Sequence, residues 1–360
     1  MLAWRLEMTG PSLRLEDVPD PVPRPGSVTI RVEACSLVSY QRRYVEGKLP
    51  GYNPPAGTFT PGTNGVGVIA EVGAQVYGLA VGQRVLTTGS VTAAENVAEP
   101  ATALLSMTAA PAAAALLNDW PEGTLAELAV APVSVVTPIP AALDGVPSER
   151  LSVVTRCLVP YGGLTRGRLA AGETVIINGA TGDFGQAAVQ VALAMGAGLV
   201  VAAGRNRTVL DRLASFDRVV SVRLTGDLEA DTAALRAATG GGADLGFDMV
   251  GQATDTTATR ATLDALRRGG RLVLMGSAQV PLTIDYTALM MTNREILGHF
   301  MYPASAPAHL LDLAAAGLLD LDAIALTTFP LAELDPAMDA AAEPGGPLVV
   351  ITPQQNGKEN

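Results

Sequence analysis

Polar and hydrophobic residues alternate in short segments over the first third of the chain, a pattern typical of β-strands with one buried face. The segments S-V-T-I-R-V-E and V-G-V-I-A-E-V-G are clear examples, and both are rich in β-branched residues. Stretches rich in proline and glycine separate the segments, which indicates turns. We predict an antiparallel, β-rich domain with strands at 28–32, 66–72, 84–86 and 126–130.

From about residue 150 the pattern changes to short, continuous apolar segments that alternate with segments of helical length. This alternation predicts right-handed β-α-β units around a parallel sheet, so the fold class is α/β. The predicted strands are 175–179, 199–204, 218–222, 245–250 and 271–276, and the predicted helices are 186–195, 208–214, 228–238 and 257–267. After residue 300 we predict helices at 306–316 and 331–342 and a strand at 347–352.

The stretch 86–122 fits neither pattern well. Part of it must be helical, because long loops without secondary structure are uncommon in compact domains. It is either an ordered elaboration near the active site or an insertion on the surface.

Composition narrows the class of protein. The chain has 360 residues, which favours two domains over one core, and a net charge of −11, which disfavours nucleic acid as a partner. The start of the chain lacks the pattern of a secretory signal, and no apolar run is long enough to span a membrane. Two cysteines cannot form a disulfide framework. We expect a cytoplasmic protein with no nucleic-acid or membrane partner.

The strongest chemical signal is the sequence V-I-I-N-G-A-T-G-D-F-G at 175–185, which lies between a predicted strand and a predicted helix. In this context small residues permit a tight turn, a close approach of the backbone to a diphosphate, and packing of the helix on the strand. The helix N-terminus then faces the phosphates. A purely structural turn is the alternative. The predicted cofactor contacts here are Ala180, Thr181, Gly182, Asp183, Phe184 and Gly185.

The end of the strand 199–204 indicates which dinucleotide binds. NAD sites place an acidic residue here to accept the ribose 2′-hydroxyl, but this chain has Gly204, followed by Arg205, Asn206 and Arg207. Guanidinium groups favour a 2′-phosphate, so we predict NADP(H). Alternatively, these arginines are only a solvated strand end. Val250 and Gly276, at the ends of the predicted strands 245–250 and 271–276, complete this part of the predicted cofactor site.

These motifs, in their order and spacing, resemble the medium-chain dehydrogenase/reductase superfamily, which includes zinc alcohol dehydrogenases and zinc-free quinone oxidoreductases. The resemblance also includes P-R-P-G-S-V-T-I-R-V-E-A-C (23–35), P-G-T-N-G-V-G-V-I-A-E-V-G (61–73) and G-G-R-L-V-L-M-G (269–276). It implies a GroES-like, β-rich catalytic domain at 1–150 and 298–360 and a doubly wound Rossmann domain at 151–297. It also implies a homodimer and an active site between the domains. Phe300 and Tyr302 would lie near the cofactor or the subunit interface.

The resemblance fails at the metal ligands of the zinc-dependent members. Their ligand positions correspond here to Val38, Ser39, the pair Thr63-Asn64, and Thr155. Cys35 and Cys157 are neighbours of such positions, and the four-cysteine structural cluster has no counterpart in 86–122. The two histidines, His299 and His309, are far from this loop in sequence. A catalytic zinc needs about three such ligands, so we predict that the protein uses no zinc.

Without a metal, hydrogen-bond donors must hold the negative charge that hydride transfer creates on the acceptor. The resemblance places Tyr40 at the position of a proton-relay hydroxyl, and Asn64 and Gln41 are further candidates for catalytic residues, with Tyr52 as a weaker one. Alternatively, Tyr40 only lines a wall and Asn64 only caps a turn.

We therefore predict a zinc-independent, NADPH-dependent oxidoreductase for a quinone or an α,β-unsaturated carbonyl. The alternatives are a zinc-free carbonyl reductase or alcohol dehydrogenase, a reductase dedicated to one biosynthetic substrate, and a non-catalytic NADPH-binding protein.

Overall fold

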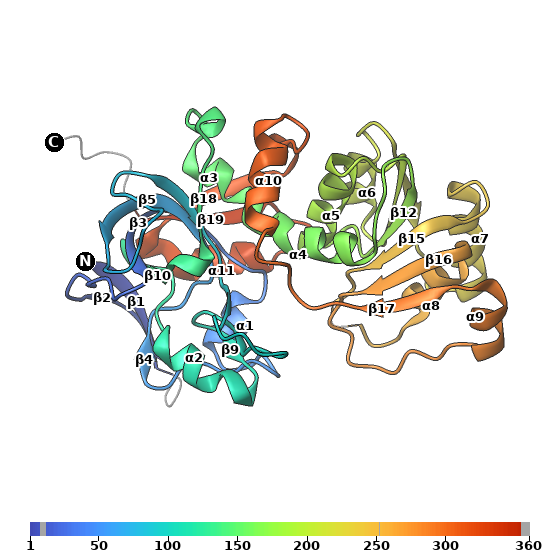
Figure 1. Ribbon diagram of the computed structural model, residues 1–360. Coiled ribbons are helices and arrows are strands. Elements are labelled where there is room, and N and C mark those ends of the chain that lie inside the picture. The colour runs from blue at the N-terminus through green and yellow to red at the C-terminus, as the bar shows by residue number, and fades with distance from the viewer. Residues whose placement is uncertain (8–11, 252, 354–360) are drawn as a thin grey trace. The chain divides into compact units, whose positions relative to one another are not determined.

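The structure is a computed structural model and describes residues 1–7, 12–251 and 253–353 (Figure 1). The chain divides into two compact units. Unit 1 comprises Met1–Thr155, Pro307–Asp312 and Ile324–Asn360, and unit 2 comprises Arg156–Ala306 and Leu313–Ala323. Within the described ranges, every helix is too short or too polar to cross a membrane.

Unit 1 is mainly β-structure. Its strands are β1 (Leu2–Glu7), β2 (Ser12–Asp17), β3 (Ser27–Ser36), β4 (Thr58–Phe59), β5 (Gly65–Val72), β6 (Arg84–Thr87), β7 (Ser90–Thr92), β8 (Thr102–Leu104), β9 (Thr108–Ala109), β10 (Leu128–Pro132), β11 (Val136–Pro138), β18 (Leu326–Pro330) and β19 (Leu348–Thr352). Its helices are α1 (Gln41–Val45), α2 (Ala114–Asp119), α3 (Ser148–Leu151) and α11 (Leu334–Ala342), with short 3₁₀ turns at Pro111–Ala113, Val133–Val135, Ala141–Leu143 and Leu331–Glu333.

The central sheet of unit 1 has the order β11-β6-β5-β3-β19-β18, and β10 also pairs with β3. The antiparallel pairing of β3, β5, β6 and β10 confirms the expected β-rich pattern. The strand β10 begins at Leu128, two residues later than predicted, because Ala126 instead forms an isolated bridge with Ala3. Strand β19 also pairs with β3, with Val350 opposite Ser36.

The stretch 86–122 is an ordered part of unit 1. It forms the small sheet β7-β8-β9 and the helix α2, so part of it is helical, as we predicted from its length. Its buried residues Val91, Leu105 and Leu117 belong to the same hydrophobic cluster as Ile30 and Ile69 of the central sheet. The stretch therefore contributes to the core of unit 1.

Unit 2 has the predicted α/β architecture, with a six-stranded parallel sheet in the order β14-β13-β12-β15-β16-β17. Its strands are β12 (Thr174–Asn178), β13 (Leu199–Gly204), β14 (Val219–Arg223), β15 (Ala243–Asp248), β16 (Leu266–Leu274) and β17 (Glu295–Gly298). Its helices are α5 (Asp183–Ala194), α6 (Arg207–Leu213), α7 (Leu228–Ala238), α8 (Thr257–Asp264) and α9 (Tyr286–Thr292), with a 3₁₀ turn at Leu321–Ala323. Two further helices, α4 (Val153–Arg166) and α10 (Ala306–Ala315), contain residues of both units.

Helix α4 is an element that the sequence pattern did not predict. It contains Pro160 and two consecutive glycines, all of which disfavour a helix. Packing explains the glycines, because a Cβ at Gly163 would lie less than 3.0 Å from the ring of Phe247 on β15. Tertiary packing therefore overrides local propensity at α4.

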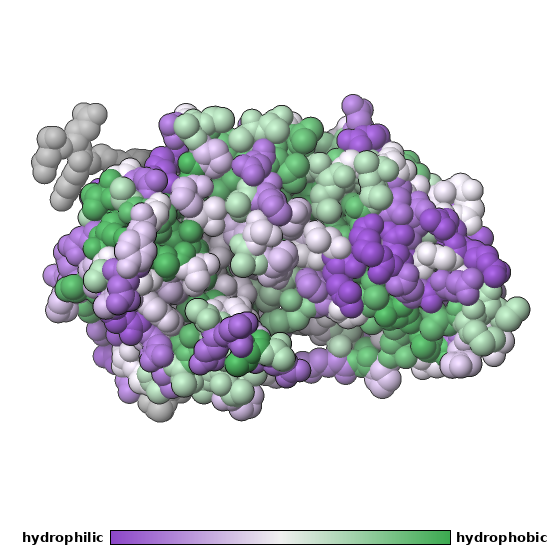
Figure 2. All heavy atoms as spheres, in the orientation of Figure 1, coloured by the Kyte–Doolittle hydropathy of each residue, from purple (hydrophilic) through white to green (hydrophobic). Residues whose placement is uncertain are grey.

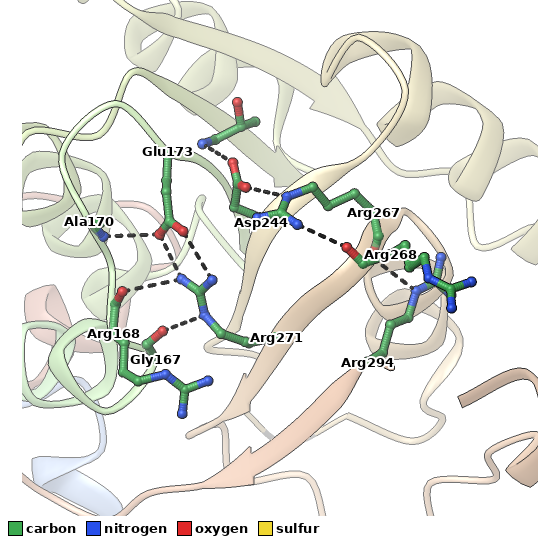
Figure 3. A network of polar contacts seen from close by, with 10 residues as sticks. Gly167, Arg168, Ala170, Glu173, Asp244, Arg267, Arg268, Arg271 and Arg294 are labelled. Atoms are coloured by element: carbon green, nitrogen blue, oxygen red, sulfur yellow. Dashed lines mark hydrogen bonds and ion pairs between the residues drawn. The ribbon is translucent and has the colours of Figure 1, made fainter. Parts of the chain in front are cut away.

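A partly buried ion pair, between the buried Arg271 and the half-buried Glu173, joins β16 to the loop before β12 (Figure 3). The Arg271 guanidinium donates to both carboxylate oxygens of Glu173, at 3.0 and 2.6 Å, and to the carbonyl oxygen of Gly167 at 2.7 Å. Burial alone would raise the pKa of Glu173, but hydrogen bonds from Arg271 and Ala170 together with the charge of Arg271 outweigh burial and lower that pKa.

We expect Glu173→Gln to lower the free energy of unfolding by about 2 kcal/mol at neutral pH, because the buried Arg271 would lose its counter-charge. Since the folded state lowers the pKa of Glu173, the stabilisation is complete above the unfolded pKa of about 4.3 and decreases as the pH falls through the folded value. Urea unfolding at neutral and acid pH should therefore give a difference that shrinks in acid. Asp217→Asn, at an exposed position of unit 2, is the control, and an equal loss in both variants would contradict the prediction.

Candidate functional site

The glycine-rich turn of unit 2 joins β12 to α5. Gly179 has a φ of +81°, which favours glycine, and Gly182 precedes the helix in an extended conformation. A Cβ at Gly185 would lie less than 3.0 Å from the carbonyl oxygen of Gly179, so only glycine allows this contact. The helix begins at Asp183, three residues before the predicted start, and Asp183, Phe184 and Gly185 form its first turn. First-turn N–H groups have no partner within a helix and can bind an anion.

The end of β13 has no space for a side chain at Gly204. A Cβ there would lie 2.6 Å from Cγ2 of Thr181, a residue of the turn that connects β12 and α5. The three residues after Gly204 are exposed. Asn206 caps α6, because its side chain accepts a hydrogen bond from Val209 N–H, and Arg207 lies 3.5 Å from Asp211. Asn206 and Arg207 thus make contacts with α6, whereas Arg205 makes neither of these two contacts.

Arg223 is a second arginine at this position that the sequence reading missed. It ends β14 and lies opposite Gly204 in the parallel register, and the next residue, Leu224, donates its N–H to the Gly204 carbonyl oxygen at 2.8 Å. Its side chain is exposed. In the sequence, Arg223 is only an arginine that follows the predicted strand 218–222. Its place beside Gly204 depends on the order of the strands in the sheet, which the sequence does not show.

Val250 and Gly276 lie together at the carboxyl ends of β15 and β16. A Cβ at Gly276 would lie less than 3.0 Å from the carbonyl oxygen of Val250. Nearby, Asp248 is buried and accepts hydrogen bonds from Asn178 Nδ2 at 2.9 Å and from Thr259 Oγ1 at 3.0 Å. Burial raises the pKa of Asp248 to about 6, although these hydrogen bonds oppose the shift. Phe300, after β17, is 73% exposed.

Arg156 of α4 is a further residue that the sequence reading missed. Its side chain is only 2% exposed, and its Nη1 atom lies 2.9 Å from Oδ2 of Asp183 in the first turn of α5. The guanidinium also lies over the ring of Phe184, 4.6 Å from the ring centroid. Burial raises the pKa of Asp183, and the charge of Arg156 opposes this shift.

The side chain of Asn64, in unit 1, is bound by its neighbours. Its Oδ1 accepts hydrogen bonds from Ser36 N and Ser36 Oγ, at 3.2 and 3.0 Å, and its Nδ2 donates to the Ser36 carbonyl oxygen at 3.3 Å. The Ser36 hydroxyl lies 2.8 Å from the Thr155 hydroxyl, which donates to the Ser152 carbonyl oxygen. Two of the positions that we predicted to correspond to metal-site residues of zinc enzymes, Asn64 and Thr155, are thus joined through Ser36.

These residues do not fit a zinc ion. Val38 offers no ligand atom, and the buried oxygens of Asn64 and Thr155 are used in hydrogen bonds with protein groups. Across residues 1–7, 12–251 and 253–353, no three His, Cys, Asp or Glu side chains lie together as a metal site would require.

The remaining candidates surround the start of α1. Tyr40 immediately precedes the helix, and its ring centroid lies 5.8 Å from that of Tyr52. Tyr44 lies beside Tyr52 and donates its hydroxyl to the Ser106 carbonyl oxygen at 2.6 Å. Gln41 is 3% exposed, and its Nε2 has no hydrogen-bond partner in the described part of the chain. A buried donor without a partner is rare in folded proteins, which makes this amide a candidate donor to a substrate.

Comparison with known families now identifies the chain. Residues 24–141 match the model of the alcohol dehydrogenase GroES-like domain, and residues 184–316 match the model of the zinc-binding dehydrogenase domain. The chain belongs to the medium-chain dehydrogenase/reductase superfamily. This superfamily uses a nicotinamide cofactor, and its GroES-like and Rossmann folds confirm the predicted fold class.

Curated relatives in the superfamily carry out several reactions. An alcohol dehydrogenase of Rhizobium meliloti is 33% identical over 188 residues, so the match spans about half the length of each chain (52% and 53%). The quinone oxidoreductase of Mus musculus is 26% identical over 81% of this chain and 77% of its own. The acryloyl-coenzyme A reductase of Sulfurisphaera tokodaii is 27% identical over 79% and 80%. These relatives are oxidoreductases, which supports the prediction that this protein is an enzyme.

A solved structure in the superfamily extends the likeness over the whole fold. The alcohol dehydrogenase TADH of Thermus sp. ATN1 matches with a TM-score of 0.82, covers 98% of this chain and 99% of its own, and is 20% identical. At this identity the likeness concerns the fold alone.

Proposed function

We propose that the protein is a zinc-independent, NADPH-dependent reductase that transfers hydride to a quinone or to the β-carbon of an α,β-unsaturated carbonyl. One observation carries the proposal. The positions that hold the metal in zinc-dependent members contain Asn64 and Thr155, which are hydrogen-bonded through Ser36. Without a Lewis acid, an acceptor that already has a high hydride affinity is the better substrate. The quinone oxidoreductase and acryloyl-coenzyme A reductase among the relatives act on acceptors of this kind.

The side chains around α1 would stabilise the reduced acceptor. NADPH supplies the hydride when it is bound. The negative charge then develops on the acceptor oxygen, where the Tyr40 hydroxyl and the Gln41 amide donate hydrogen bonds. The unused Nε2 of Gln41 supports this role, whereas the Asn64 amide is taken up by Ser36 and positions the loop. Water supplies the proton that completes the reduction, so the net change consumes one NADPH and one proton.

The residues at the ends of β13 and β14 support NADPH over NADH. Gly204 leaves no carboxylate to repel a 2′-phosphate, and two positively charged residues are close to it in the backbone, Arg205 as the next residue and Arg223 as its register partner on β14. The first turn of α5, with Gly182 before it, receives the diphosphate. Val250, Gly276 and Phe300 line the nicotinamide half of this site in the proposal.

We also propose that the protein acts as a homodimer in the cytoplasm. β17 is the outer strand of the unit 2 sheet, and Tyr286, Met290 and Met291 of the adjoining α9 are exposed. On the face drawn in Figure 2, unit 2 carries a mainly apolar area beside a strongly hydrophilic one. An outer strand with exposed apolar residues next to it is suited to pairing with a second copy.

Consumption of NADPH with matched acceptors tests the proposed function. We expect cyclohex-2-enone and benzoquinone to be reduced with a kcat/KM at least about tenfold above that of cyclohexanone, because only the first two are conjugated acceptors. NADPH should exceed NADH by at least about tenfold, and a chelator should have no effect. Reduction of cyclohexanone alone would indicate a carbonyl reductase, and NADPH binding without turnover of any acceptor would indicate a binding protein. Loss of activity with the chelator would contradict zinc independence.

A further inference from the structure

The first turn of α5 contains a carboxylate, Asp183, at the place where the proposed function puts the diphosphate of NADPH. The N–H groups of this turn attract phosphates, but a negative side chain beside them repels phosphates. A dinucleotide site with this residue therefore needs a compensating positive charge close to Asp183.

Arg156 supplies that charge from a different helix. Its guanidinium is buried, lies 2.9 Å from the Asp183 carboxylate, and is stacked over Phe184, the next residue of the same turn. Figure 1 shows α4, which carries Arg156, beside α5. Stacking on Phe184 and the ion pair together hold the guanidinium at the N-terminal end of α5. The two charged side chains, Arg156 and Asp183, and the Phe184 ring all belong to unit 2.

We propose that Arg156 is a positioning residue of the dinucleotide site, which neutralises Asp183 and thereby lets the diphosphate approach the first turn of α5. The inference rests on the proposed function, because the ligand is the diphosphate of the nicotinamide cofactor. It assigns the diphosphate half of the site to the Arg156–Asp183 pair, whereas Arg205 and Arg223 serve the 2′-phosphate half.

Binding measurements on charge variants test the assignment at about pH 8, where an unpaired carboxylate is ionised. We expect Arg156→Gln to weaken NADPH and NADH about tenfold, because Asp183 would then repel the diphosphate. Adenosine 2′-monophosphate, which has no diphosphate, should bind as before. The matched control Arg205→Ala should give the opposite pattern, with weaker binding of adenosine 2′-monophosphate and NADPH and unchanged binding of NADH.

The decisive variants remove the negative charge instead. Asp183→Asn alone should bind NADPH at least as tightly as the unmodified protein, and Arg156→Gln with Asp183→Asn should recover most of the lost affinity. A purely structural ion pair would show no such rescue. Weaker NADPH binding by Asp183→Asn, or unchanged binding by Arg156→Gln, would overturn the inference and leave the proposed function intact. If Arg156→Gln does not fold, Asp183→Asn and Arg156→Lys still decide the matter, since Lys should retain the affinity. Failure of the unmodified protein to bind NADPH would overturn the proposed function and, with it, this inference.

Discussion

Gly185→Ala should lower the free energy of unfolding by about 4 kcal/mol even in the absence of cofactor, because the new methyl group would displace the backbone at Gly179. Gly182→Ala should behave differently. A Cβ at Gly182 would have only the Gly179 carbonyl oxygen nearby, at 3.3 Å, so the loss of stability should be about 1 kcal/mol or less. The same methyl group would stand where the proposed function brings the diphosphate to the backbone, and NADPH should bind about tenfold more weakly.

Chemical unfolding and titration with NADPH separate the two effects. Gly185→Ala should show both a lower free energy of unfolding and weaker NADPH binding. Gly182→Ala should show mainly weaker NADPH binding. If Gly185→Ala were as stable as the unmodified protein, that result would contradict the close contact between Gly185 of α5 and the backbone of Gly179. If Gly182→Ala kept its full affinity, the diphosphate would bind elsewhere.

Asn64→Ala should lower the free energy of unfolding by about 3 kcal/mol. The substitution would remove the side chain that accepts from the buried Ser36 N–H and donates to the Ser36 carbonyl oxygen, and buried groups without partners are costly. The Ser36 hydroxyl would lose Asn64 Oδ1 and keep its contact with Thr155. Thr63→Ala is the matched control in the same loop, because Thr63 is partly exposed and its hydroxyl receives a single hydrogen bond among the described residues, from Asn64 Nδ2 at 3.3 Å. The control should lose about 1 kcal/mol or less.

Denaturant unfolding combined with steady-state kinetics distinguishes this structural role from a catalytic one. A catalytic donor at position 64 would leave stability near normal in Asn64→Ala and reduce kcat. That result would restore Asn64 as the group that replaces the metal. The expected result instead leaves this task to Tyr40 and Gln41.

The alternation of strands and helices in unit 2 could be predicted from the sequence because each signal is local. Strand β13 (Leu199–Gly204) and helix α7 (Leu228–Ala238) have the predicted bounds. A continuous apolar run marks the first, and Asp227 marks the start of the second by accepting a hydrogen bond from Ala230 N–H. The turn between β12 and α5 was predictable for the same reason, since Gly179, Gly182 and Gly185 lie close together in sequence.

Features that depend on the spatial arrangement of distant residues could not be predicted. Arg223 lies opposite Gly204 only because β14 is the neighbour of β13 in the sheet. Arg156 reaches Asp183 from a helix whose own sequence, with Pro160 inside it, argued against a helix. The hydrogen-bond partner of Asn64 could not be predicted either, because Ser36 is distant from it in sequence.

The pairing of β19 with β3 affects how the protein matures during synthesis. β3 is made early, yet its partner β19 ends at Thr352, after all of unit 2. The sheet of unit 1 is therefore completed only after β19 has been synthesised, whereas both segments of unit 2, Arg156–Ala306 and Leu313–Ala323, precede β19 in the chain and are available to fold earlier. Until then the edge of β3 at Cys35 and Ser36 is open, and an open strand edge can pair with another chain.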